Sequence, residues 1–173
     1  GDQLPPIRRF KYTGESYFET MGNRLVAGRA ITWADIEERA KVVVVTENLA
    51  REEWGDPAVA VGKRVRNFLG QGGAGPWYEV VGVAGDIRDN GVGQDPVATV
   101  YWPQIVQPTP GGDISGPRSM SYAVRVRSGD PRALLPAIRE AVWSVNPSLP
   151  VAQERTLEEL ASRSMAQTSF TLI

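Results

Sequence analysis

The pattern of apolar and polar positions divides the chain into a strand-rich first part and a more regularly alternating C-terminal part. A run of valines predicts a buried strand in the first part, at residues 41–45, and another strand is predicted at residues 78–87. Shorter apolar runs predict further strands at residues 7–12, 65–69 and 99–102. The two strands that flank the glycine-rich turn, 65–69 and 78–87, are expected to pair as a hairpin.

Short helices are predicted between these strands from apolar spacing and capping residues. Residues 16–21 have the spacing of one or two helical turns, which Gly22 ends. Thr32 and Asp35 form an N-capping pattern at the start of a second short helix. Thr46 is expected to cap a third helix directly after the first buried strand.

From residue 119 onward the pattern becomes more regular. A half-buried strand is predicted over residues 119–127, because apolar side chains alternate there with polar or small ones: Met120, Tyr122, Val124 and Val126. A helix over residues 130–145 follows, and Pro136 predicts that its first turn is irregular. A short strand at residues 149–153 precedes a last helix, which a capping box at Thr156 opens.

These elements predict an α+β fold with two lobes. Residues 1–14 and 117–173 are expected to form a β-α-β-α lobe, to which the strand at residues 7–12 is assigned. Residues 15–116 are expected to form an inserted, strand-rich lobe that carries the short helices. Prolines and glycines in residues 104–117 predict a loop where the inserted lobe returns to the first.

Composition narrows the possible chemistry. The chain has 19 basic and 20 acidic residues and a net charge of -1, which argues against nucleic acid as a partner. It has no cysteine and no histidine, so thiol catalysis, Ser-His-Asp triads and His- or Cys-ligated metals are excluded. The sequence therefore predicts a protein without catalytic residues, metal or cofactor. A carboxylate-based hydrolase stays open as a lesser alternative.

Two local motifs have a functional and a structural interpretation. Residues 70–75 match the dinucleotide-binding pattern G-x-G-x-x-G, but they lead into a strand rather than a helix and are interpreted as a hairpin loop. Asp86, Asp89 and Asp95 follow a strand and have the residue type that binds calcium. Their spacing is equally typical of a solvated turn, and the turn is favoured.

Tryptophan residues supply the candidate contact sites. Trp33, Trp54 and Trp143 lie on amphipathic patterns and are expected to pack in the core or at its edge. Trp77 and Trp102 flank loops and are the candidates for a surface that contacts a partner. They would also serve a secreted carbohydrate- or peptide-binding module, which is the alternative function from the residues alone.

Three ordered motifs resemble a known family. They are Tyr17-Phe18 running to Gly28-Arg29, then Gly62-Lys63-Arg64-Val65, and then the strand from Tyr78 to Val83 followed by Asp86. The set resembles the MacB-like periplasmic core domain of FtsX-like or MacB-type ABC transporter permeases. By this resemblance the glycines permit tight turns and the valines fill the inserted lobe.

The resemblance implies a non-catalytic extracytoplasmic domain, located between two membrane helices of a bacterial inner-membrane permease. It would transmit ATP-driven motion to a periplasmic partner or cargo, in export or lipoprotein handling. The implied partners are a second permease copy or half, a cytoplasmic ABC ATPase, and a periplasmic adaptor or lipoprotein. The N-terminal part of the α/β lobe is expected to be truncated. Apolar surface on the last two helices is then expected to drive dimerisation in isolation.

Overall fold

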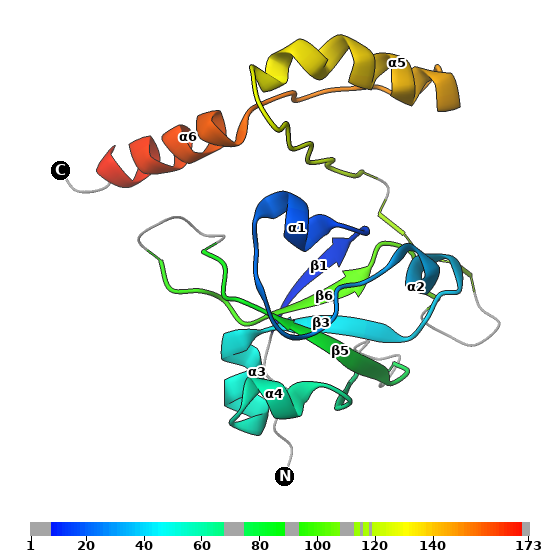
Figure 1. The fold of residues 1–173 in the computed structure, drawn as a ribbon, viewed down its shortest axis with the longest axis vertical. Helices are drawn as coiled ribbons and strands as arrows, with labels where there is room; N and C mark the ends of the chain where they lie inside the picture. The colour runs from blue at the N-terminus through cyan, green and yellow to red at the C-terminus, as the bar shows by residue number, and fades with distance from the viewer. Residues whose placement is uncertain are drawn as a thin grey trace. The chain divides into compact units, whose positions relative to one another are not determined.

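A computed structural model describes residues 8–67, 75–88, 94–107, 113–114, 116–117 and 119–170 (Figure 1). Contacts within the chain divide it into two compact units. The first, here called the sheet unit, comprises Gly1–Asp89 and Asp95–Ala123. The second, the helical unit, comprises Asn90–Gln94 and Val124–Ile173. The fold is of the predicted mixed class, with one six-stranded sheet and several short helices.

The sheet unit is built on strands that pair in the order β1-β6-β3-β5-β2, with β4 also paired to β5. Their bounds are β1 Arg9–Thr13, β2 Leu25–Gly28, β3 Val42–Thr46, β4 Arg64–Val65, β5 Tyr78–Ala84 and β6 Thr99–Pro103. The pairs β1–β6 and β3–β5 are parallel, and the other pairs are antiparallel. The predicted hairpin is therefore confirmed in the pairing of β4 with β5.

Short helices cover both faces of this sheet, as Figure 1 shows. Helices α1 (Tyr17–Met21) and α2 (Trp33–Glu37) lie on one face, and α3 (Glu47–Trp54) and α4 (Pro57–Ala60) lie on the other. All five residues of β3 are buried, and its valines alternate between two apolar clusters, one beneath each helical layer. A strand with helices on both sides needs an unbroken apolar sequence, which explains the run of valines.

Local signals in the sequence account for the ends of several helices. Gly22 ends α1 with a left-handed φ of 77°, and Thr32 with Asp35 forms the predicted capping box of α2. Thr46 is the N-cap residue of α3, as predicted, but its side chain makes no capping hydrogen bond, and its hydroxyl instead accepts a hydrogen bond from Thr99 N–H at 2.9 Å. Asp86 replaces it and accepts a hydrogen bond from the Asn48 N–H at 2.8 Å.

A close approach between β2 and β5 explains two glycines. Gly28 has a φ of 68°, and a Cβ there would lie 2.2 Å from the Val81 carbonyl oxygen. A Cβ on Gly82 would lie 2.1 Å from the Arg29 carbonyl oxygen. Since Arg29 N–H also donates to Val81 O at 2.9 Å, neither position has room for a side chain. Gly28 of the first family-like motif therefore has a packing role.

The helical unit contains the 3₁₀ turn η2 (Pro131–Leu134) and the helices α5 (Leu135–Val145) and α6 (Leu157–Phe170). The irregular first turn predicted from Pro136 is confirmed. The predicted capping box is also confirmed. Thr156 N–H donates to Glu159 Oε2 at 3.0 Å, and Glu159 N–H donates to Thr156 Oγ1 at 3.2 Å. Among the described residues, no helix combines the length and the apolar character needed to cross a membrane.

Three strand predictions differ from the structure. The first strand does not join the C-terminal part, because β1 pairs in parallel with β6 and Phe10 packs on Trp102 at 5.4 Å between ring centroids. Residues 119–127 and 149–153 have no strand pairing anywhere in the described ranges. Their periodicity suits a strand, but a strand forms only where a neighbour supplies hydrogen bonds. The predicted lobe limits at residues 14 and 117 stay a prediction.

Candidate partner-binding surface

Trp77 is an exposed aromatic residue in the described part of the β4–β5 hairpin. It lies directly before β5 and is 50% exposed. The guanidinium of Arg66 lies 4.6 Å from the centre of its ring, which is a cation–π contact. Arg66 is also exposed, so the pair presents a flat aromatic surface and a positive charge together. Such a pair suits contact with a protein surface or another planar polar group.

Main-chain hydrogen bonds fix the base of this hairpin. Gly62 N–H donates to Val80 O at 2.8 Å, and Val80 N–H donates to Lys63 O at 2.8 Å. Nearer the turn, Gly75 N–H donates to Asn67 O at 2.9 Å. Main-chain hydrogen bonds therefore flank Trp77 on both sides along the chain. The glycine motif predicted as a hairpin loop lies largely outside the described residues, which stop at residue 67 and resume at residue 75.

Trp102, the second candidate contact, belongs to the core instead. Its side chain is 4% exposed and packs edge-on against Phe10 and Tyr78, with centroid distances of 5.4 Å and 4.5 Å. The prediction placed it at a loop because Pro103 follows, but Pro103 is the last residue of β6. Burial leaves Trp102 no surface for a partner. Its Nε1–H has no hydrogen-bond partner in the described part of the chain.

The carboxylates considered as calcium ligands do not converge. Asp86 accepts the Asn48 N–H bond that begins α3, and the Asn48 side chain donates to Pro96 O at 2.9 Å. Asp95 is exposed, and Asp89 lies outside the described residues. Among the residues that the structure describes, no group of three or more acidic side chains is arranged to hold a metal ion. Asp86 therefore has a structural role here.

Asp35 is a buried carboxylate whose pKa is lowered. Its oxygens accept hydrogen bonds from Arg29 Nη1 at 2.5 Å and Nη2 at 3.0 Å, and from Thr32 N–H at 2.8 Å. The Arg29 bond is the main reason why the pKa of Asp35 falls from 3.8 to about 2, against the opposing effect of burial. The carboxylate thus stays ionised and joins β2 to α2.

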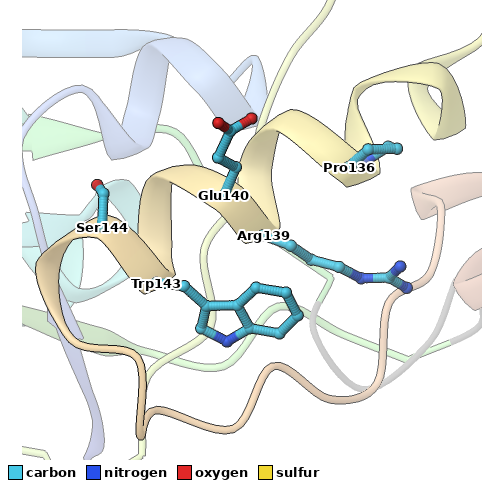
Figure 2. Close-up of a pocket in the computed structure, with 5 residues that line it drawn as sticks. All are labelled: Pro136, Arg139, Glu140, Trp143 and Ser144. Atoms are coloured by element: carbon cyan, nitrogen blue, oxygen red, sulfur yellow. The ribbon is translucent and has the colours of Figure 1, made fainter.

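Helix α5 of the helical unit carries a shallow hollow of about 560 Å³. All its lining residues come from this one helix: Pro136, Arg139, Glu140, Trp143 and Ser144 (Figure 2). Arg139 forms a two-point ion pair with Glu154 at 2.6 Å and 2.5 Å, and Trp143 Nε1–H donates to Leu149 O at 3.1 Å. These bonds join Leu149 and Glu154 to α5, so Arg139 and Trp143 of the hollow have a structural role.

Comparisons with known proteins identify the family of the chain. Residues 5–141 match the family described as the MacB-like periplasmic core domain. Since the match covers most of the chain, the chain belongs to this family of periplasmic domains of ABC transporter permeases. No curated protein is significantly similar to it.

Among solved structures, the fold is similar to the periplasmic region of MacB from Actinobacillus actinomycetemcomitans, with a TM-score of 0.51 and 17% identity. That alignment covers 84% of this chain but only 60% of the MacB chain, so this chain spans less than two thirds of its length. A domain of a protein described as a permease from Porphyromonas gingivalis aligns at a TM-score of 0.37 with 19% identity, over 84% of this chain and 67% of the other. The second likeness is too low to support an argument.

Proposed function

We propose that the chain is a non-catalytic, motion-transmitting domain of an ABC permease in a bacterial inner membrane. A cytoplasmic ATPase drives the parent permease, and this domain passes the movement to a second permease copy or half and to a periplasmic adaptor, lipoprotein or cargo. The observation that carries the proposal is the family match over residues 5–141.

The construction of the sheet unit supports this role. Its sheet is packed on both faces by helices, with two apolar clusters that share strand β3. Close-packed interiors deform little, so such a unit moves as one body when a force acts on it. Its buried carboxylates hold elements together: Asp35 pairs with Arg29, and Glu47 pairs with Arg24 and Arg51. Carboxylates committed in this way do not supply the free acid and base of a hydrolase.

Two spin-label distances test the proposal in the parent permease, reconstituted in lipid vesicles. Because this chain contains no cysteine, single labels can be placed at chosen residues of the domain once any cysteine elsewhere in the parent permease is replaced. A label on Val59→Cys, in exposed α4, measures the distance between the domains of two copies. We expect this distance to change between the nucleotide-free and the vanadate-trapped state. A label pair on Val59→Cys and Glu37→Cys within one domain is the control, and its distance should stay constant.

An unchanged distance between the two copies would overturn the proposal, and a changed distance within one domain would contradict the rigid unit. The contact role of Trp77 is tested separately by a photo-cross-linking residue at that position. Trp33 is the matched control, because it is 49% exposed against 50% for Trp77. We expect cross-links to envelope proteins from position 77 and none from position 33. Equal cross-linking from both positions would remove Trp77 as a specific contact.

A further inference from the structure

The β4–β5 hairpin has one side that packs into the core and one side that faces away from it. Val65 pairs with Tyr78, and both pack into the apolar cluster beneath α3 and α4. Because side chains alternate along a strand, the residues next to this pair lie on the opposite side of the hairpin. The 4.6 Å contact between the Arg66 guanidinium and the Trp77 ring agrees with this placement. The residues of this side, here called the hairpin face, are Arg64, Arg66, Trp77 and Glu79.

The arginines of the hairpin face have no carboxylate partner. Arg64 and Arg66 are exposed, and none of the ion pairs among the described residues includes either of them. By contrast, Arg29 is bound to a buried carboxylate through two hydrogen bonds. Lys63, directly before β4, is a third exposed cation, and Glu79 is the acidic residue of the face. Since the whole chain has a net charge of -1, this positive charge is a local feature of the hairpin.

The spacing of the two arginines matches the spacing of side chains in an extended peptide. Arg64 and Arg66 are two residues apart along one chain, so in strand geometry their Cα atoms are about 7 Å apart. A guanidinium binds a carboxylate through two parallel N–H donors. Stacking on Trp77 uses the flat side of the Arg66 guanidinium and leaves the N–H donors, which lie in its plane, for a ligand. An extended chain with an acidic residue at every second position presents its carboxylates at the same spacing of about 7 Å.

The number of cations favours a protein segment over a membrane surface. Basic clusters that bind anionic lipid contain about four to eight Lys or Arg residues. Residues 63–84, which form the hairpin, contain three, together with Glu79. A protein segment needs only one arginine for each carboxylate that it presents. Trp77 adds the type of side chain that, like arginine, is enriched at protein interfaces.

We propose that the hairpin face binds an extended acidic segment of a partner protein, in which alternate carboxylates pair with Arg64 and Arg66. The inference rests on the contact role proposed above for Trp77, and it adds the chemistry of the partner, which is Asp or Glu at every second position. Its failure would remove the acidic partner but would leave the motion-transmitting role, because the spin-label distances test that role without the hairpin.

Fluorescence anisotropy with two labelled synthetic peptides tests the proposal on the 173-residue chain. Both peptides contain the same number of glutamates among serines, at every second position in one peptide and at every third position in the other. In an extended chain the first spacing places all the carboxylates on one side, and the second divides them between both sides. We expect the first peptide to bind about threefold more tightly, and its affinity to fall as salt is added.

Variants of the arginines assign the binding to the hairpin face. Arg64→Gln and Arg66→Gln each remove one partner of a carboxylate, and we expect each to weaken binding of the first peptide about fivefold. Arg66→Lys keeps the charge but loses the two-point donor geometry, so its affinity should lie between those of the wild type and Arg66→Gln. Arg39→Gln is the matched control, because Arg39 is exposed, has no ion pair among the described residues and lies outside the hairpin. It should leave the affinity unchanged, and circular dichroism verifies that each variant is folded.

A wild-type chain that binds neither peptide would overturn the proposal. Equal affinity for the two peptides, or an equal loss in Arg39→Gln and Arg64→Gln, would contradict it, because binding would then depend on total charge alone. Vesicles of phosphatidylglycerol test the lipid alternative, and we expect the chain not to bind them. Binding to these vesicles that Arg64→Gln weakens, without binding of the peptide, would assign the hairpin face to lipid and would also overturn the proposal.

Discussion

The sheet unit and the helical unit use apolar residues in opposite ways. In the sheet unit, β3 has all five of its residues buried. In the helical unit, none of the 11 residues of α5 is buried. Leu157 of α6 is 57% exposed. The sheet unit thus completes its own core, whereas the helical unit leaves apolar surface that its own residues do not cover.

The difference follows from where the contacts lie along the sequence. Strand β3 pairs with β5 and β6, whose residues are more than 30 positions away, and such pairings enclose a core. In the described part of the helical unit, polar contacts join residues that are closer in sequence, such as Arg139 with Glu154 and Trp143 with Leu149. A helix with only local contacts has little surface against which to bury its apolar side chains. Folding stability is therefore expected to reside in the sheet unit.

A carboxylate introduced into each unit is expected to give the largest difference in unfolding free energy. Val44→Asp places a carboxylate where the side chain is 0% exposed, and we expect it to cost about 4 kcal/mol or more in unfolding free energy. Val145→Asp, on α5, should change the unfolding free energy by no more than about 0.5 kcal/mol. Urea denaturation followed by tryptophan fluorescence measures both. Equal losses would show that the two units share one core.

Two glycine substitutions separate close packing from backbone strain. Gly28→Ala introduces a Cβ 2.2 Å from Val81 O at a φ of 68°, and we expect a loss of about 2–3 kcal/mol. Gly55→Ala meets the same kind of backbone strain, at a φ of 80°, but has no atom within 4 Å, and should cost only about 1 kcal/mol. The urea midpoints of the two variants provide the comparison. Similar midpoints would remove the β2–β5 clash as a determinant of stability.

The smallest expected difference in unfolding free energy is between the ion pairs of the two units. Its size depends on pH. The pKa of Asp35 is lowered from 3.8 to about 2, so its stabilisation is complete above about pH 4 and lost as the pH falls toward 2. Arg29→Gln should therefore cost about 1–2 kcal/mol at pH 7, after allowance for the half-exposed arginine, and much less at pH 2.

Arg139→Gln is the counterpart in the helical unit, where the Arg139 bond lowers the pKa of Glu154. Because this pair is at the surface, the unfolding of the sheet unit should not respond to its loss. Urea unfolding at pH 2, 4 and 7 measures both variants. A pH-independent loss in Arg29→Gln would contradict the assigned role of Asp35.

Features that depend on a few neighbouring residues could be predicted from the sequence. The valine run of β3, the capping box of Thr32 and Asp35, and the irregular turn before Pro136 are set by local propensity and hydrogen bonding. Each was recognisable because the interacting groups lie within about one turn of each other. The exposure of Trp77 agrees with its predicted place beside a loop, but its role as a contact stays a prediction.

Features that depend on distant residues could not be predicted. The pairing of β1 with β6 joins Arg9 to Thr99, and no local signal selects that partner. The burial of Trp102 depends on Phe10 and Tyr78, which come from two other strands. In residues 119–127 the alternation predicted a strand that the structure does not have, because periodicity does not say whether a partner strand exists. Identifying a partner requires knowledge of the tertiary or quaternary structure.

The parallel pairing of β1 with β6 also determines how the sheet unit bears mechanical load. The chain enters the sheet at Arg9, at one end of this pair, and leaves β6 at Pro103, at the opposite end. A pull on these two points acts along both strands in opposite directions and loads the hydrogen bonds of the register from Arg9–Thr99 to Thr13–Pro103 in shear, all at once. Bonds that share a load resist it far better than bonds opened one after another. Tension between these points would therefore displace the sheet unit as a whole before it unravels.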